Sequence, residues 1–340
     1  MKKQLIITSL FVISACASTN NISGNVIPTE IDGLKVFKLS QIKSCGLKNK
    51  QGSYLQVCDK KTDELLTGVK YETDSSDENI SYYKDGWMTK FISKDNGVIV
   101  HEYNTTIDIE NKLFNHTYKN YFDDGSLSCE RTEIENIEGE LFSLNETCYY
   151  NNGGLMSKTV MNRDDGYVKI DYDPSGKVIT KRTKPSESPH NEFIDPWTRY
   201  DINGNLYTGK ITYYFQSEPE RISSIIQVKN GKLDGESQHF PLKEDFDAGD
   251  RETIYTYENG AMIKSKTFKE NKEVANETIL SDNNSMMMIV YHRNNRGTIR
   301  CTYKDNSYVM ISGKAVEEFL KLFKKDSTKS ICPDLSRFIK

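Results

Sequence analysis

The sequence predicts a mainly β protein: an elongated, open antiparallel sheet of repeated β-hairpins with one amphipathic α-helix as its C-terminal cap. A turn motif that places an aromatic residue shortly before a glycine recurs along the chain. Only 36% of the residues are hydrophobic, whereas 11% are aromatic, including 20 tyrosines. This combination is typical of thin sheets with a solvated face. One segment near the C-terminus has the periodicity of a helix.

Residues 1–15 have the pattern of a secretory signal peptide. Lys2 and Lys3 precede a short apolar run over 5–12, which is too short to span a bilayer. The following residues, Ile-Ser-Ala-Cys at 13–16, resemble the lipobox of bacterial lipoproteins. In that family the cysteine carries a diacylglyceryl thioether and becomes the first mature residue, so the resemblance implies lipidation of Cys16. An ordinary signal peptide with a chance cysteine is the alternative.

Residues 16–33 form the lipidated N-terminus and a tether rich in Ser, Thr and Asn, which we expect to be flexible. No later segment is apolar for 18 residues, so the lipid is expected to be the membrane attachment. In the lipoprotein family an Asp after the cysteine resembles an inner-membrane retention signal, and this chain has Ala17. The expected location is therefore the bacterial envelope, with the outer membrane, on its periplasmic side, favoured over the inner membrane.

The charge pattern argues against a nucleic-acid partner. The formal net charge is −4, and the chain has no basic block or Arg-rich stripe that could track a phosphate backbone.

The cysteines indicate an oxidising compartment. Six follow the lipobox: Cys45, Cys58, Cys129, Cys148, Cys301 and Cys332. The first two are centred on Gln51-Gly52 and the next two on Glu138-Gly139, so each pair is expected to lie directly opposite across a hairpin, within disulfide reach. The first hairpin belongs to an N-terminal region over 34–66. The last pair would join the C-terminal segment to the preceding strand. Metal binding by these cysteines is disfavoured because no C-x-x-C motif exists.

The repeated turn predicts the body of the sheet. Its copies are 82–86, 121–125, 149–153, 172–176, 200–204 and 257–260, with a degenerate copy at 228–231. Asn-Gly and Asp-Gly turns between aromatic or β-branched runs are a strong hairpin signal. We predict one repeat array over 67–183 and a second over 198–280. Residues 184–197, rich in Pro and Ser, are expected to be a linker or a long exposed loop.

A second repeated element has a glycine at its third position, where a strand is expected to begin, and ends in an aromatic residue. It occurs at 66–71, 207–214 and 233–240. Together with the turns, it resembles the bacterial MORN-repeat variant, clearly over 198–272, fairly over 66–100 and loosely over 118–183. The resemblance implies stacked β-hairpins in an open single-layer sheet. The family is associated with antitoxin components, which implies binding and neutralisation of a toxin or effector.

The C-terminal region over 281–340 is expected to contain strands around 286–292 and 298–303 and a helix over 314–325. Val316, Phe319, Leu320 and Phe323 follow the spacing of one apolar helix face, and Ser312 is a suitable N-cap. Because repeat sheets need covered ends, we predict that this helix caps the last strands. A partner-binding helix is the alternative.

No motif predicts catalysis, a cofactor or a metal. The five histidines, His101, His116, His190, His239 and His292, lack metal-site spacing, and no nucleophile elbow or phosphate-binding loop is present. Asp123-Asp124 and Asp164-Asp165 adjoin turn glycines, which explains them better than acid–base chemistry. The segment 171–176 begins like a calcium loop but has Arg182 at position twelve, where a bidentate Glu is required. A weak loop-type calcium site and a hydrolase with dispersed residues remain open.

Three tyrosine pairs are the candidate binding surface: Tyr82 and Tyr83, Tyr149 and Tyr150, Tyr213 and Tyr214. In a strand, one residue of each pair should pack and the other should face water. A row of outward tyrosines suits a protein or glycan partner, although the need of a thin sheet for tyrosines that stiffen both of its faces is the favoured explanation. The expected function is non-catalytic binding of an envelope protein. A structural or assembly lipoprotein that binds envelope polymers or outer-membrane proteins is the alternative.

Overall fold

The structure is a computed structural model that describes residues 27–48, 54–74, 76–187, 193–242, 252–269, 273–280, 286–290, 297–302, 308–312, 314–316 and 319. The chain is mainly β, with open antiparallel sheets built from many hairpin strands, as predicted. It divides into two compact units. Unit 1 comprises 1–153 and 158–165, and unit 2 comprises 154–157 and 166–340. Within the described segments, no helix has the length and apolarity that a membrane crossing requires.

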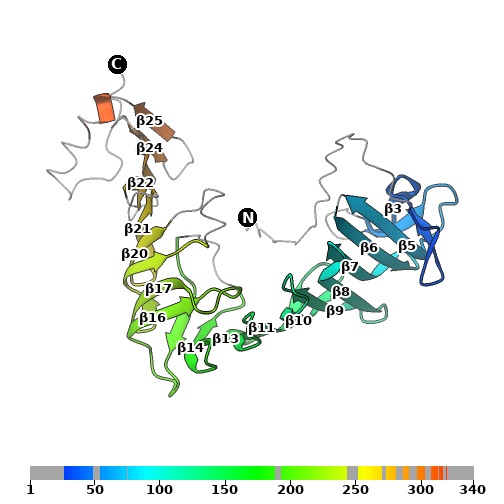
Figure 1. Cartoon of the computed structure of the whole chain (residues 1–340), viewed down its shortest axis with the longest axis horizontal. Coiled ribbons are helices and arrows are strands. Elements are labelled where there is room, and N and C mark those ends of the chain that lie inside the picture. The colour runs from blue at the N-terminus through cyan, green and yellow to red at the C-terminus, as the bar shows by residue number, and fades with distance from the viewer. Residues whose placement is uncertain are drawn as a thin grey trace. The chain divides into compact units, whose positions relative to one another are not determined.

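In the main sheet of unit 1, strands that follow one another in the sequence are mostly neighbours (Figure 1). The pairs from β5 to β11 are antiparallel, whereas β2 pairs with β5 in parallel. The strands are β1 (Glu30–Ile31), β2 (Leu34–Phe37), β5 (Gly68–Asp74), β6 (Asp77–Lys84), β7 (Trp87–Asp95), β8 (Val98–Asp108), β9 (Leu113–Tyr121), β10 (Leu127–Asn136), β11 (Leu141–Tyr149) and β12 (Leu155–Asn162), the last of which crosses the unit boundary.

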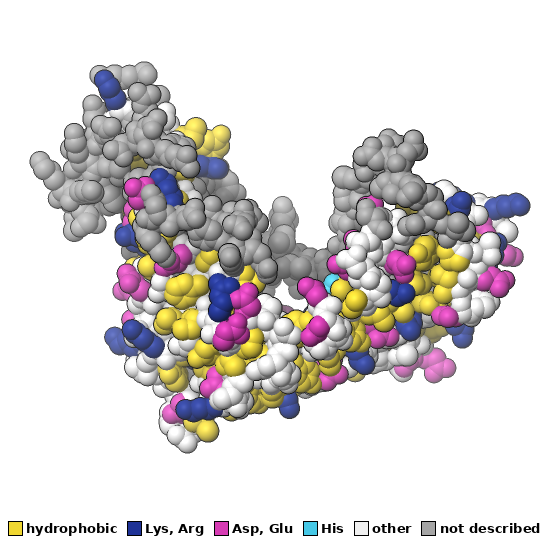
Figure 2. Space-filling view, viewed as in Figure 1, with side chains coloured by type: hydrophobic (Ala, Val, Ile, Leu, Met, Phe, Trp, Pro, Cys, Tyr) yellow, Lys and Arg dark blue, Asp and Glu magenta, His cyan; other side chains and the backbone are white. Residues whose placement is uncertain are grey.

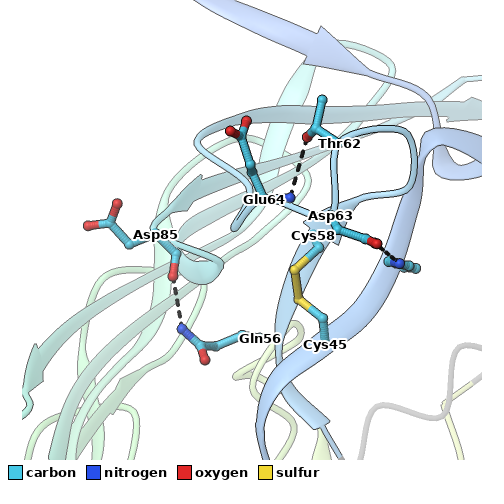
Figure 3. Close-up of a disulfide and its surroundings, with 8 residues drawn as sticks. Cys45, Gln56, Cys58, Thr62, Asp63, Glu64 and Asp85 are labelled. Carbon is cyan, nitrogen blue, oxygen red and sulfur yellow. Dashed lines mark hydrogen bonds and ion pairs between the residues drawn. A yellow bond between two sulfur atoms is a disulfide. The ribbon is translucent and has the colours of Figure 1, made fainter.

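A separate two-stranded sheet carries the first disulfide. The 3-10 turn η1 (Leu39–Gln41) leads into β3 (Ile42–Lys48), which pairs with β4 (Tyr54–Asp59). Cys45 and Cys58 are disulfide-bonded, with 5.9 Å between their Cα atoms (Figure 3). The predicted turn at 51–52 lies outside the described residues.

The register of this hairpin corrects the sequence argument. Cys45 lies opposite Gln56, not opposite Cys58, and the register shifts after Cys45. Gly46 adopts a φ of +70 within this irregular stretch. The one extra residue of the irregularity displaces the pairing, so the two cysteines are diagonal neighbours rather than a directly opposed pair.

The second disulfide has the predicted register. Cys129 on β10 and Cys148 on β11 are directly opposite partners, and their Cα atoms are 4.1 Å apart. The hairpin turns at Gly139, which has a φ of +77. Cys301 is disulfide-bonded and buried, but its predicted partner Cys332 lies outside the described residues, so that pairing stays a prediction.

Unit 2 contains the remaining strands. One group is β13 (Gly166–Tyr172), β14 (Val178–Lys184) and β15 (Thr198–Tyr200). The other is β16 (Gly209–Tyr214), β17 (Ile222–Lys229), β18 (Lys232–Leu233), β19 (Gly235–His239), β20 (Thr253–Glu258), β21 (Ala261–Phe268), β22 (Val274–Leu280), β23 (Met286–Val290), β24 (Thr298–Thr302) and β25 (Tyr308–Ser312), with β18 paired only to β17 and off the main strand path.

The segment 184–197 does not separate the units. It joins β14 to β15, and these two strands pair with each other, for example Arg182 with Arg199. The chain instead divides within 153–166. The Pro and Ser content therefore marks a loop inside one sheet, because hydrogen bonding across the two flanking strands holds its ends together.

Three segments meet at the Gly86 turn through a closed ring of backbone hydrogen bonds. The Val57 N–H donates to the Gly86 carbonyl (2.9 Å). The Gly86 N–H donates to the Leu66 carbonyl (2.8 Å), and the Leu66 N–H donates to the Val57 carbonyl (2.9 Å). The Thr67 hydroxyl accepts the N–H of Asp85 (3.1 Å). We call this arrangement a glycine clasp.

Unit 2 repeats the glycine clasp. The Arg199 N–H donates to the Gly231 carbonyl (2.9 Å). The Gly231 N–H donates to the Tyr207 carbonyl (2.8 Å), and the Tyr207 N–H donates to the Arg199 carbonyl (3.0 Å). The Thr208 hydroxyl accepts the N–H of Asn230 (3.0 Å). A partial third copy forms at the Gly260 turn. In all three copies, a side chain accepts the N–H of the residue before the turn glycine. The accepting residue directly precedes the glycine that begins the next strand: Thr67 before β5, Thr208 before β16 and Asp234 before β19. The two repeated sequence elements are thus the two halves of one contact.

Small apolar clusters provide the core. One contains Phe37, Ile42 and Leu66, and another Ile211, Ile226, Val228 and Leu233. The third lies at the C-terminal strands and contains Met287, Ile289, Ile299, Cys301, Ile311, Val316 and Phe319. Residues 314–316 and Phe319 are helical, and Val316 and Phe319 are each 2% exposed. The described part of the predicted helix therefore covers the last strands, while Leu320 and Phe323 lie outside the described residues.

Candidate functional site

In each tyrosine pair, one residue packs against the protein and the other is half-buried, as the predicted alternation requires. Tyr83 and Tyr213 pack against apolar clusters, and Tyr150 is 2% exposed. Their partners Tyr82, Tyr149 and Tyr214 are half-buried.

Within unit 1, Tyr82 lies on β6 and Tyr149 on β11, with four strands between them. Five strand spacings correspond to roughly 24 Å. Tyr82 also donates a hydrogen bond to Asp32 (2.7 Å) and lies under the Lys90 ammonium. The row of tyrosines expected from the sequence is therefore separated into individual half-buried residues.

Unit 1 instead gathers polar and aromatic side chains on one face of β8, β9 and β10. His116 on β9 lies directly opposite Thr105 on β8 and Glu133 on β10. Glu135 is two residues from Glu133 and so projects from the same face. His116, Thr105 and Glu133 are buried, with 6 to 7% of each residue exposed.

Both ring nitrogens of His116 have partners in this cluster. Its Nδ1 lies 2.7 Å from the Tyr103 hydroxyl and 2.9 Å from the Thr105 hydroxyl. Its Nε2 lies 3.0 Å from Glu135 Oε1. A ring held at both nitrogens has a fixed orientation, so Nε2 is directed toward the carboxylates.

Glu133 has its own partners. The Tyr118 hydroxyl donates to Glu133 Oε1 (2.7 Å), and the Arg131 guanidinium forms an ion pair with the same carboxylate. Burial and the hydrogen bond to Glu133 raise the pKa of Tyr118 well above its ordinary value. Tyr118 therefore remains a hydrogen-bond donor at neutral pH.

Aromatic rings surround the histidine. The centroids of Tyr103 and Phe114 lie 5.4 and 5.8 Å from that of His116, and Trp87 lies 5.4 Å from Phe114. Burial raises the pKa of Tyr103 to about 12. These rings cover a polar cluster that would otherwise face water in a single-layer sheet.

The sequence does not predict this cluster. His116 has the pattern of an ordinary strand residue, because no second ligand follows it at a metal-site spacing. Glu133 and Glu135 are 17 and 19 positions further along the chain, on the next strand. The useful signal would have been the register of one hairpin, combined with the Glu-x-Glu alternation on a single strand.

The other sequence candidates have structural roles. Asp173 accepts the backbone N–H groups of Ser175 and Lys177 (2.9 and 3.0 Å), so the calcium-like segment is an Asx-stabilised turn. Asp124 likewise accepts the N–H of Ser126 (2.8 Å). Among the other histidines, His101 contacts Asn120 (2.8 Å) and His239 packs edge-on against Tyr255, while His190 and His292 lie outside the described residues.

Unit 2 contains a buried cluster of ion pairs and aromatic rings. Arg182 pairs with Asp171 (2.7 Å) and lies over the rings of Trp197 and Tyr213, at 5.0 and 5.7 Å from their centroids. Arg199, 4% exposed, pairs with Asp195. Both arginines have a carboxylate partner, so these ion pairs hold β13–β15 and β16 together.

Alkaline pH should destabilise unit 2 through Tyr213. Its phenol oxygen is buried, and this burial raises the pKa of Tyr213 to about 12, despite the opposing effect of Arg182. The unfolded chain loses the Tyr213 phenol proton near pH 10, whereas the folded chain keeps it until about pH 12. The free energy of unfolding is therefore unaffected by this group below pH 10 and falls as the pH rises toward 12. A shift of about 2 units corresponds to about 2–3 kcal/mol. We expect Tyr213→Phe to reduce this loss in urea unfolding between pH 9 and 12, with Tyr257, whose pKa burial also raises to about 12, contributing the remainder. An unchanged profile would contradict this prediction, and Tyr214→Phe serves as the neighbouring control.

Comparison with known proteins assigns no family. No family model and no curated protein sequence matches the chain. Among solved structures, a porin-like protein from Bacteroides uniformis is similar over 63% of this chain and 96% of its own, with 12% identity and a TM-score of 0.18. A putative 6-phosphogluconolactonase from Bacteroides fragilis is similar over 76% of this chain and 96% of its own, with 11% identity and a TM-score of 0.15. At these TM-scores neither similarity informs the function.

Proposed function

We propose that the chain is a lipid-anchored protein of the bacterial envelope that binds a protein partner through the faces of its repeat sheet, without catalysis. The observation that carries the proposal is the burial of β20, β21 and β22. All residues of β21 and β22 are half-buried, and so are all of β20 except Glu258. Tyr257 on β20 and Ile279 on β22 contact the neighbouring apolar clusters, but no residue of these three strands is fully buried, so both faces remain partly accessible.

The contrast with β17 supports this interpretation. That strand alternates between buried and more exposed positions, with Ser224, Ile226 and Val228 buried against the core. The same sheet therefore has a part that packs and a part that displays its side chains. Extended repeat surfaces of this kind are used for protein recognition. Hydrophobic side chains are visible between charged ones on the surface (Figure 2).

The anchor and the location rest on the sequence. Cys16 lies outside the described residues, and its lipobox-like context supports the lipid and the envelope. The two described disulfides agree with an oxidising compartment such as the periplasm. Neutralisation of a toxin or effector is the role that the MORN-like repeats suggest.

Site-specific photo-crosslinking in intact cells tests the binding face. A photoreactive phenylalanine replaces Ser265 or Lys266, neighbours on β21 that project from opposite faces, and Tyr82 or Tyr149 in unit 1. We expect one face of β21 to yield a single envelope protein. The control is Ile202, an 80% exposed turn residue. No protein adduct from any strand position, or the same adducts from Ile202, would contradict the proposal. Adducts with peptidoglycan alone would favour the structural role.

The anchor has an independent test. We expect Cys16→Ser to move the chain from the membrane fraction to the soluble fraction, because one thioether-linked lipid supplies the attachment. Retention of the variant in membranes would show that another segment binds them. Since crosslinking reports on β21 and fractionation on Cys16, the two parts of the proposal can fail separately.

A further inference from the structure

We propose that His116, Glu133 and Glu135 form a binding site for one divalent transition-metal ion of the Zn²⁺ type. One ligand atom from each residue lies within 4.8 Å of the other two. The site is on the face of β9 and β10 in unit 1 and does not depend on the proposed protein partner.

The present spacing is close to that of a coordination shell. Zn²⁺ binds His nitrogen and carboxylate oxygen at about 2.0–2.2 Å, so ligand atoms around a tetrahedral ion lie about 3.4 Å apart. His116 Nε2 and Glu135 Oε1 are now 3.0 Å apart. An ion between them therefore needs only a few tenths of an ångström of widening there. Glu133, whose ligand atom lies within 4.8 Å of the other two, needs to approach by at most about 1.4 Å.

The histidine is already oriented for coordination. Its Nδ1 contacts the hydroxyls of Tyr103 and Thr105, whose oxygens can accept a hydrogen bond from Nδ1 when Nδ1 carries the proton. That tautomer leaves the lone pair on Nε2, which is the atom directed at the glutamates. Hydrogen bonding at the remote ring nitrogen is the usual support of a metal-bound histidine, and hydroxyl oxygens serve here in place of a carboxylate.

Glu133 keeps coordination capacity beside its existing partners. Tyr118 occupies one lone pair of Oε1, and a carboxylate offers about four in all. Arg131 balances the charge of Glu133, but Glu135 carries a second negative charge on the same face. A divalent cation would be attracted by that charge and held by all three ligands.

The donor set selects the class of ion. One imidazole with two carboxylates suits Zn²⁺ and related transition metals, whereas Ca²⁺ and Mg²⁺ prefer oxygen ligands alone. Glu135 has a 31% exposed side chain, which provides a route from solvent. With three protein ligands, a fourth position stays available to water or to a side chain of a bound partner.

Metal binding to the purified full chain tests the site. The chelator-stripped protein, in detergent, is titrated with ZnCl₂ against a chromophoric chelator. We expect one equivalent to bind, and His116→Gln or Glu135→Gln to weaken binding at least about 100-fold, because each variant removes a direct ligand. CaCl₂ at the same concentrations should not compete. Thr105→Val should weaken binding about 10-fold, as loss of an outer-shell partner does.

Two matched controls separate this site from adventitious binding. Glu130→Gln changes an exposed glutamate on the opposite face of β10, and His101→Gln changes a histidine on β8. Neither should alter the affinity. Equal weakening by the controls and the ligand variants, competition by CaCl₂, or no saturable binding at one equivalent would overturn the proposal.

X-ray absorption of the Zn²⁺-loaded unmodified chain gives a second measurement if the ligand variants fail to fold. One imidazole among oxygen ligands supports the site, and a shell without imidazole overturns it.

Discussion

Replacing Gly86 with alanine is expected to destabilise unit 1 by about 2–5 kcal/mol, whereas the same change at Gly97 should cost only about 1–2 kcal/mol. Both glycines end two-residue turns, after Asp85 and Asn96, and have φ values of +79 and +82. The left-handed backbone penalises a Cβ at both positions by about 1–2 kcal/mol.

The two positions differ in the space around them. A Cβ on Gly86 would lie 2.9 Å from the Leu65 side chain, 3.0 Å from the Val57 carbonyl oxygen and 3.1 Å from Gln56 Cβ, whereas a Cβ on Gly97 has no atom within 4 Å. Forcing atoms into such a contact adds about 1–3 kcal/mol. Urea unfolding of the two variants measures the difference. Equal destabilisation would show that the glycine clasp does not require close approach.

Unit 2 offers the same comparison independently. A Cβ on Gly231 would lie 2.9 Å from Leu206 and 3.0 Å from the Arg199 carbonyl oxygen, whereas Gly204 has open space. If Gly231→Ala and Gly204→Ala separate in the same way, the clasp is a repeated feature of the fold. A penalty confined to unit 1 would make it a local feature.

Removal of the Cys129–Cys148 disulfide should destabilise unit 1 by about 3 kcal/mol. The bond closes a loop with a sequence separation of 19, and restricting the unfolded chain to this extent gives roughly that value. The strands themselves should persist, because the flanking residues pair in register from Glu130 to Ile134. The double variant Cys129→Ser/Cys148→Ser avoids a free thiol, and its urea midpoint measures the loss.

The Cys45–Cys58 disulfide provides the comparison. Its sequence separation is 13, so the corresponding double variant should lose a similar amount. The two bonds lie in different sheets, and distant effects normally add, giving about 6 kcal/mol for the quadruple variant. Preserved stability after loss of Cys129–Cys148 would contradict the entropic argument. A loss much larger than the sum would indicate that the two hairpins fold as one unit.

Local signals predicted much of the fold. An Asn-Gly or Asp-Gly pair tolerates the positive φ of a tight turn, so the hairpins at Gly86, Gly231 and Gly260 could be located directly. The Cys129–Cys148 pair followed from symmetry about a turn glycine. The packing of Val316 and Phe319 followed from helical periodicity. In each case the deciding interaction lies within a few residues or one hairpin.

The glycine clasp is a contact that local sequence signals do not predict. Its two halves, a turn glycine and a glycine-initiated strand, were both visible as repeated elements. Their contact joins Gly86 to Leu66 and Val57, which belong to other segments. Only the stacking of successive hairpins brings these three backbones within hydrogen-bonding distance.

What the sequence by itself determined is the set of turns, the alternation of strands and the pairing of Cys129 with Cys148, because each depends on backbone preferences over short distances. Only the tertiary structure decided the offset of Cys45 from Cys58, since one irregularity displaces a register. It also decided that β14 and β15 close a hairpin across 184–197. Above all, strand register placed His116 beside Glu133 and Glu135, and no spacing in the chain encodes that neighbourhood.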